Sequence, residues 1–382
     1  MRTKPNVLAT AVYGLIAAVM SVFAALEVGE AFFAVLRRIY GFGKTNGLPK
    51  WLSQTNRQML RSAMRSYKRL PFFTKISLTR SFIQGFLGYK RGKAPFITVL
   101  DVTYVCNLQC EGCFSSDVRN NVSLDEHVLE ERLRDLYDNH SRVIIISGGE
   151  PTCYRKLYGI LGRFPEMFFY VFTNGTQISE SLAEEILGCR NVFHFVSVDG
   201  NEETITKRRG AGVYTKIQDC VRLFRSKRIP FGVSSTISRS NKEYVSSPAF
   251  YTQYADLGAS CVLYLLVNVV NCENPEFVDS EGYRAFSSAI ENNRKTGRQV
   301  LTINLPWDES RFSSKGCFAG SHILHIDLYG GVRICPFSRE IVANLGDFGG
   351  FAQAYPFVLA SGRCNLCAQN KTSTIALDHA AV

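Results

Sequence analysis

The chain has 382 residues, of which 46% are hydrophobic and 20% charged, and its formal net charge is +11. This length suggests two or three domains, and the composition excludes a wholly disordered chain, a collagen and a coiled coil. The first 100 residues hold 16 of the 44 Lys and Arg but only two acidic residues, Glu27 and Glu30, so they carry +14 and the rest −3. A nearly neutral body argues against nucleic-acid binding and leaves the basic N-terminal region to be explained.

The N-terminal region begins with twenty uncharged residues, Val7–Leu26. Twenty helical residues rise about 30 Å, the thickness of a bilayer's hydrocarbon core, so residues 1–30 are predicted to be a single membrane anchor. The heavier positive flank follows the segment, which places the body on the cytoplasmic face. The alternatives are a helix that lies in the membrane interface or packs on the body, and a cleaved signal peptide, which would export a thiol-rich body. The alternative location is a soluble cytoplasmic protein.

Residues 31–94 are predicted to be a basic amphipathic linker. Within it, residues 51–70 place apolar side chains on one helical side and five Lys and Arg over much of the rest. Such a helix beside an anchor suits an anionic membrane surface. The alternative is a solvated helix that covers the catalytic body.

From residue 95 to about 275, strands and helices alternate. The strand candidates are Ile97–Val102, Val143–Ser147, Phe168–Thr173, Val192–Val198, Phe231–Ile237 and Cys261–Val267. The helix candidates are Leu124–Asn139, which Ser123 and Glu126 open as a capping box, Lys156–Phe164, Ser179–Leu187, Tyr214–Lys227 and Lys242–Ala255. Six such units predict an α/β fold with a parallel sheet, too short to close and therefore an open or partial (β/α)6 barrel.

Three cysteines follow the first strand in the run CNLQCEGC: Cys106, Cys110 and Cys113. Three thiolates in one loop can hold three irons of a [4Fe–4S] cluster and leave the fourth open for a ligand. A zinc knuckle or a chance spacing is the alternative. The scattered cysteines Cys153, Cys189, Cys220, Cys261 and Cys272 are interpreted as buried thiols.

At these motifs the chain resembles the radical S-adenosylmethionine (SAM) superfamily. The matching segments are CNLQCEGC (106–113), SGGEPT (147–152), FTNGT (172–176), SVDG (197–200) and RRGAGVY (208–214). The resemblance covers residues 95–270 and implies a partial barrel whose three-cysteine cluster binds SAM through its open iron. It further implies SAM contacts from Gly148, Gly149, Glu150, Asn174 and Ser234, with Ser235 as the alternative to the last. One departure is Gly112, where many members carry an aromatic residue; Phe114 follows the third cysteine instead.

The C-terminal region, residues 317–382, gathers four more cysteines: Cys317, Cys335, Cys364 and Cys367. Residues 316–337 alternate apolar side chains about a Gly330–Gly331 turn, which predicts a β-hairpin. Four thiols suit a zinc ribbon or an iron–sulfur cluster equally. The segment also resembles the SPASM or twitch extensions of radical SAM enzymes, which implies one fully ligated auxiliary [4Fe–4S] cluster.

Two further expectations complete the C-terminal half. His322 and His325 are interpreted as hairpin residues, not ligands. Residues 276–316 are expected to connect the barrel to the extension, with a polar helix over Asn274–Arg298 and a strand over Leu301–Trp307.

The resemblance implies an enzyme that cleaves SAM reductively and uses the 5′-deoxyadenosyl radical to remove hydrogen from a substrate carbon. The N-terminal region favours a membrane-associated, lipid-like substrate. The alternatives are a peptide or protein maturase, which the extension favours, and a non-catalytic iron–sulfur or zinc scaffold. A low-potential electron donor such as flavodoxin or ferredoxin is the expected partner.

Overall fold

The structure is a computed structural model that describes residues 62–63, 65–266, 276–295, 300–305, 308, 319–320 and 322–361. The expected anchor over residues 1–30 and the basic segment up to residue 61 lie outside the described residues, as do Cys317, Cys364 and Cys367. Among the helices that the structure does describe, none is long and apolar enough to cross a bilayer.

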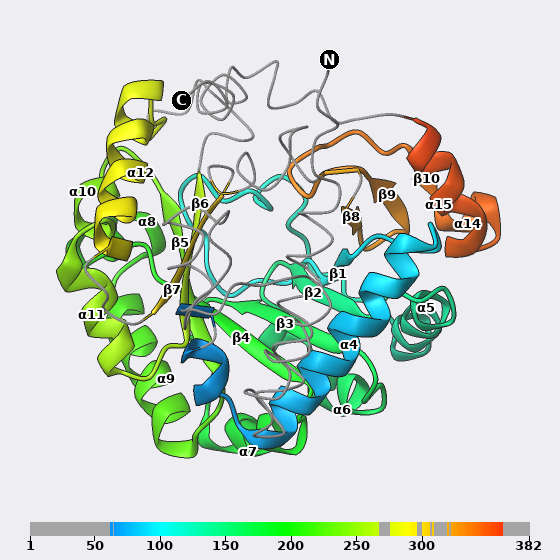
Figure 1. The fold of residues 1–382 in the computed structure, drawn as a ribbon, viewed down its shortest axis with the longest axis horizontal. Coiled ribbons are helices and arrows are strands. Elements are labelled where there is room, and N and C mark those ends of the chain that lie inside the picture. Colours follow the sequence, from blue (N-terminus) through cyan, green and yellow to red (C-terminus); the bar gives the residue numbers. More distant parts are fainter. Residues whose placement is uncertain are drawn as a thin grey trace, which may run out of the picture.

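A ten-stranded sheet organises the molecule, in the order β10-β9-β8-β1-β2-β3-β4-β5-β6-β7 (Figure 1). The six predicted strands are present as β1 (Ile97–Thr103), β2 (Val143–Gly148), β3 (Phe168–Thr173), β4 (Val192–Ser197), β5 (Phe231–Ile237) and β6 (Cys261–Leu266). Each pairs in parallel with the next in sequence, as the alternation with helices requires. In Figure 1 the sheet curves as an open arc with helices along its outer side.

Helices connect these strands and cover the outer face of the sheet. They are α5 (Glu126–Asp138), α6 (Leu157–Gly162), α7 (Glu180–Gly188), α8 (Glu202–Arg209), α9 (Val213–Lys227), α10 (Lys242–Val245) and α11 (Pro248–Asp256). The main core lies between the helices and the sheet and includes Leu133, Ile146 and Phe224. The strands carry apolar residues on this outer face and also on the inner face, which is typical of parallel sheets.

The sheet is longer than the six strands that the sequence predicted. β7 (Leu301–Leu305) pairs in parallel with β6, and α12 (Ser280–Lys295) before it buries Tyr283 and Ile290. The segment expected to be a connector is therefore one more β/α unit of the sheet. Its helix was predicted as polar because only one of its sides carries the apolar residues.

The predicted hairpin is confirmed as β8 (Ile323–Ile326) and β9 (Gly331–Arg333), with His325 opposite Arg333. Gly330 makes the turn at φ +86°, in the left-handed region that favours glycine. β8 also pairs in parallel with β1, so the extension continues the sheet at its other edge. β10 (Ala343–Asn344), α14 (Leu345–Phe348) and α15 (Phe351–Ala360) follow it.

The inner face of the sheet carries a second apolar cluster, which includes Phe168, Phe195 and Leu263. Tyr67 and Leu70, from the basic N-terminal region, belong to the same cluster. The end of the 51–70 segment thus packs on the body, as its second interpretation expected. The residues that follow form α4 (Phe72–Lys90), a helix where the sequence predicted a linker.

Two predicted helices differ in detail for local reasons. The first helix is capped by Asp125, whose carboxylate accepts from the His127 amide, because the Ser123 hydroxyl bonds to Thr103 Oγ1 at 2.6 Å instead. The helix expected over Lys242–Ala255 is divided into α10 and α11, since Ser247 caps a new helix whose first residue is Pro248.

Candidate active site

The cysteine loop leaves the carboxyl end of β1 and is held there by the glycines after β2. The Gly149 amide donates to Thr103 O at 2.7 Å, and the Glu150 amide donates to Val105 O at 2.8 Å. Gly148 has φ +122°, and a Cβ atom at this position would lie 2.1 Å from Thr103 O. The Gly-Gly pair therefore lets two backbones meet at a distance that a side chain would prevent.

Glu150 is a fully buried junction between β2 and β3. Its Oε1 accepts from the Thr152 and Thr173 hydroxyls, both at 2.6 Å, and from the Thr152 amide at 3.1 Å. Its Oε2 accepts from the Asn174 amide at 2.6 Å. Burial raises the pKa of Glu150, while these hydrogen bonds oppose the rise. The carboxylate is thus occupied by the protein's own donors, so its first role is to hold the loops in register.

The segment after β3 reaches the cysteine loop directly. Asn174 Nδ2 donates to Asn107 Oδ1 at 3.0 Å, and Asn107 Nδ2 donates to Thr176 Oγ1 at 2.8 Å. Asn107 is the residue after Cys106, so the FTNGT segment fixes the start of the loop. The structure therefore brings the predicted residues Gly148, Glu150 and Asn174 together around the first cysteine.

Ser234 and Ser235 point to opposite sides of β5. Phe231, Val233 and Ile237 belong to the core under the helices, so Ser235 faces the helices and Ser234 faces inward. Of the two serines, only Ser234 has the orientation that a contact with a ligand inside the arc requires. Its contact with SAM remains a prediction.

On the other side of the loop, Asp199 ties β4, β5 and α8 together. Its carboxylate pairs with Arg208 and with Arg209 (2.6 Å to Nη2) and accepts from the Thr236 amide at 2.8 Å. Burial alone would raise the pKa of Asp199, but the two guanidinium groups outweigh it and hold the pKa below its usual range. Arg208 also donates through Nε to Glu111 O at 3.2 Å, so the Asp199–Arg208 pair is bonded to the cysteine loop.

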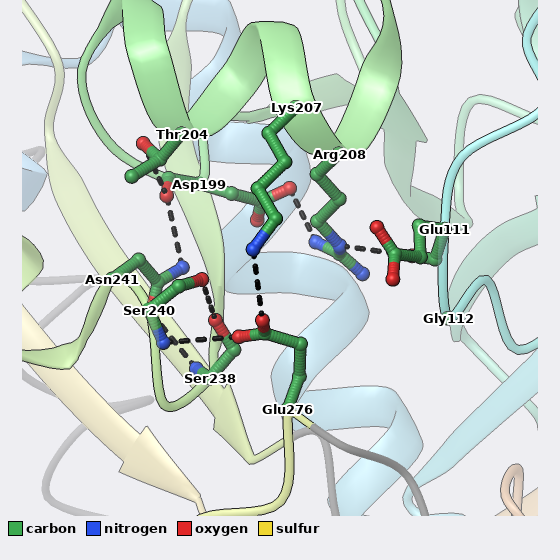
Figure 2. Close-up of a pocket in the computed structure, with 10 residues that line it drawn as sticks. All are labelled: Glu111, Gly112, Asp199, Thr204, Lys207, Arg208, Ser238, Ser240, Asn241 and Glu276. Atoms are coloured by element: carbon green, nitrogen blue, oxygen red, sulfur yellow. Dashed lines mark hydrogen bonds and ion pairs between the residues drawn. The ribbon is translucent and has the colours of Figure 1, made fainter.

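A pocket lies beside Asp199 and Arg208 (Figure 2). Among its lining residues are Glu111 and Gly112 from the cysteine loop, Asp199, and Ser240 and Glu276 from beyond β5 and β6. None of the predicted SAM contacts lines it. It therefore flanks the cysteine loop and is separate from the site that Gly148, Glu150 and Asn174 form.

The three cysteines are free, half-buried thiols on one loop. In the described part of the chain, no three Cys, His, Asp or Glu side chains are already gathered to hold a metal ion. Burial raises the pKa of Cys106 and Cys110, and at Cys110 the nearby Arg209 opposes the rise. Thiols of this number and spacing are the donors that iron–sulfur clusters use, so the donor set fits, and binding requires the loop to draw the thiols together.

Cys153, one of the scattered cysteines, lies beside this loop, in the turn that follows Glu150. Burial raises the pKa of its thiol to about 11, and Glu150 adds to the rise. A thiol with so high a pKa remains protonated at neutral pH. Cys153 is half-buried, whereas Cys189, Cys220 and Cys261 are buried as predicted.

Residues of the extension contact the cysteine loop just after Cys113. Arg339 donates to Phe114 O and to Asp117 Oδ1, and its guanidinium lies 4.0 Å from the centre of the Phe114 ring. Phe337 packs edge-on against the same ring at 5.6 Å. Phe114, the aromatic residue displaced from its usual place, therefore faces the extension. Cys335 is buried three residues before Ser338 in the same segment.

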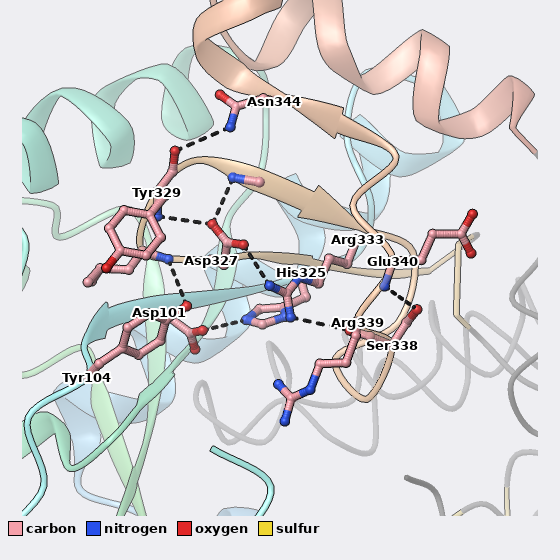
Figure 3. Close-up of polar contacts among 12 residues, drawn as sticks. Asp101, Tyr104, His325, Asp327, Tyr329, Arg333, Ser338, Arg339, Glu340 and Asn344 are labelled. Atoms are coloured by element: carbon pink, nitrogen blue, oxygen red, sulfur yellow. Dashed lines mark hydrogen bonds and ion pairs between the residues drawn. The ribbon is translucent and has the colours of Figure 1, made fainter. Parts of the chain in front are cut away.

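A buried contact between a histidine and a carboxylate, which the sequence did not reveal, joins the extension to β1 (Figure 3). His325 Nε2 lies 2.9 Å from Asp101 Oδ2, and both side chains are almost fully buried. His325 Nδ1 is also buried, without a hydrogen-bond partner in the described structure. The signal in the sequence was a single charged residue, Asp101, in a strand of apolar residues and threonines. His322, just before β8, lies with its Nε2 3.0 Å from the Tyr89 hydroxyl of α4.

Comparison with known proteins places these features in a family. The model of the radical SAM superfamily matches residues 100–240. The Fe-coproporphyrin III synthase of Methanosarcina barkeri is 24% identical over 332 residues, 74% of this chain and 82% of that protein. The sporulation killing factor maturation protein SkfB of Bacillus subtilis is 22% identical over 71% of this chain and 68% of its own.

Among solved structures, Streptococcus suis SuiB bound to its precursor peptide SuiA superposes with a TM-score of 0.59. The match covers 87% of this chain and 80% of SuiB at 13% identity, so it shows a shared fold. It extends well past the barrel and therefore includes part of the C-terminal extension.

Proposed function

Because the chain belongs to the radical SAM superfamily, with a C-terminal extension of the SPASM/twitch kind, we propose that it removes a hydrogen atom from a peptide or protein substrate. It is an enzyme whose cofactors are SAM, a [4Fe–4S] cluster and an auxiliary [4Fe–4S] cluster. When bound, the first cluster and SAM supply a 5′-deoxyadenosyl radical that takes hydrogen from an unactivated carbon. A non-catalytic scaffold does not agree with this family.

We assign the first cluster to Cys106, Cys110 and Cys113. The observation that carries the assignment is the convergence of the motifs after β1, β2 and β3 on this one loop. Arg209, buried beside Cys110, supplies positive charge where thiolates would gather. We assign the auxiliary cluster to Cys335 with Cys317, Cys364 and Cys367, the last three from outside the described residues.

The chain's own residues prepare this site in three ways. Glu150 and Asn174 fix the entrance of the cysteine loop, and Asp199 with Arg208 fixes its middle. The inner face of the sheet below the loop is lined by aromatic and aliphatic side chains, which exclude water from a reactive radical.

A peptide substrate is supported by the names of several relatives. SkfB and the mycofactocin maturase MftC of Mycolicibacterium smegmatis are maturation proteins, and SuiB holds a precursor peptide in its structure. These relatives favour the maturase alternative over the lipid-like substrate that the N-terminal region suggested. A low-potential donor such as flavodoxin or ferredoxin remains the expected electron source.

A tetrapyrrole is the second candidate substrate. The observation that favours it is the alignment with Fe-coproporphyrin III synthase over 82% of that protein's length.

One experiment separates the two. Cells that express the parent chain or the Cys110→Ala variant are compared by mass spectrometry of their small peptides and of their extracted porphyrins. We expect a peptide whose mass differs between the two strains, with identical porphyrins. Unchanged peptides and a changed porphyrin profile would instead support the second candidate.

A further inference from the structure

Helix α4 lies across the end of the sheet opposite to the cysteine loop. Ser81 Oγ donates to Glu166 O at 2.9 Å, just before β3 begins. Gly85 and Gly88 sit against Arg142 and His140, at the start of β2. These contacts are all at the amino ends of strands, whereas the cysteine loop leaves the carboxyl end of β1 (Figure 1).

The burial of α4 is the reverse of what an amphipathic helix on a protein core shows. Its buried residues are all small or hydroxylated: Thr74, Ser77, Thr79, Ser81, Gly85 and Gly88. Four of its large apolar residues are exposed, with exposed fractions of 57% for Phe72, 52% for Phe73, 43% for Ile76 and 47% for Leu87. The other large apolar residues of the helix are half-buried: Leu78, Phe82, Ile83 and Phe86.

Small residues on the inner side let the helix approach the sheet closely, but they do not explain the outer side. Phe72, Phe73 and Ile76 lie in the first turns of the helix. Leu87 lies about 17 Å further along the same side, with the half-buried Ile83 between them, so the four exposed residues mark one apolar side of the helix. Single exposed apolar residues are ordinary, but a contiguous stripe marks a surface that something covers.

The surroundings of this stripe are basic. Residues 62–95 contain no Asp or Glu, and they include the exposed residues Lys68, Arg69, Arg80, Lys90, Arg91 and Lys93. Arg80 is paired with Glu166. Arg190, from the turn before β4, adds its guanidinium 4.1 Å from the centre of the Phe73 ring. An apolar stripe within a cationic border is the pattern that helices lying in an anionic membrane interface show.

We propose that the outer side of α4 is a docking surface for an anionic lipid bilayer, with Phe72, Phe73, Ile76 and Leu87 in the interface. The basic residues around them attract the headgroups. Because α4 closes the amino end of the sheet, docking turns the cysteine loop away from the membrane. The site then opens to the aqueous phase, where a peptide substrate arrives. The proposed docking to the membrane is independent of which substrate the enzyme uses.

The test measures the fluorescence of a single introduced tryptophan in each variant. Full-length reconstituted protein carrying Phe72→Trp is mixed with vesicles of phosphatidylglycerol and phosphatidylcholine whose acyl chains are brominated, and the emission is compared with that of the parent. The matched control is Phe357→Trp on α15, where the parent residue is 50% exposed. Vesicles of phosphatidylcholine alone form the second arm.

The quantity compared is the tryptophan fluorescence that each variant shows above that of the parent. For Phe72→Trp we expect this fluorescence to fall at least twofold with the anionic vesicles and less without phosphatidylglycerol. For Phe357→Trp we expect no fall. Equal quenching of the two variants would overturn the assignment of this face. Equal quenching in both lipids would overturn the anionic partner. Emission of Phe72→Trp that is already shifted to the blue and unquenched by either lipid would show that the protein itself covers α4, and would also overturn the proposal.

Discussion

Replacing Glu150 by Gln tests whether this buried carboxylate holds the site together. All four of its partners donate hydrogen bonds, and three of them bond to one oxygen while the Asn174 amide bonds to the other. A Gln side chain that keeps the first oxygen must turn its amide nitrogen toward the Asn174 N–H. One buried donor then loses its acceptor, which costs about 2 kcal/mol, and a chain of this size melts a few degrees lower.

The assay is thermal unfolding followed by circular dichroism, together with 5′-deoxyadenosine formation by the reconstituted protein. We expect a melting temperature about 2.5 °C lower and slower SAM cleavage, because Glu150 orients the segments on both sides of the first cysteine. Glu131→Gln, on the exposed side of α5, is the matched control and should change neither quantity. A Glu150→Gln variant that melts and reacts like the parent would refute the hydrogen-bonding argument.

Three more substitutions test other parts of the structure. Gly148→Ala places a Cβ 2.1 Å from Thr103 O, so it should lower the iron bound per chain after reconstitution; full iron loading would contradict the close contact. Asp199→Asn leaves Arg209 buried without its counter-charge and should lower the free energy of unfolding by about 3 kcal/mol in urea titrations. Burial lowers the pKa of His194 to about 3, below its value of about 6.5 in the unfolded chain, so protons bind the unfolded state first. Stability should therefore fall by about 2 kcal/mol from pH 7 to pH 5, and His194→Gln should remove that part of the fall.

The strands were predictable because each is a short apolar run between helical segments. The polar helix α8 was not, since Ile205 is its only buried residue and its other residues show no apolar period. The capping residue of α5 depended on a contact from outside the helix, because Ser123 is bonded to Thr103 at the end of β1. Local sequence carries no information on such a partner.

Some features of the site were likewise predictable from the sequence and others were not. The motif order predicted that Gly148, Glu150 and Asn174 would gather at the cysteine loop, and the structure brings them together. The sequence did not reveal that Glu150 is fully occupied by internal donors, nor that His325 meets Asp101, because both depend on the pairing of distant strands. The strand order, with β8 beside β1, is a property of the whole fold.

The central claim is that Cys106, Cys110 and Cys113 hold the cluster that cleaves SAM. The most direct measurement is 5′-deoxyadenosine formed from SAM after reduction of reconstituted protein, for the parent chain, the three single Cys→Ala variants and Cys153→Ala. We expect product from the parent and from Cys153→Ala, and none from the three loop variants. Product at the parent rate from Cys110→Ala would contradict it.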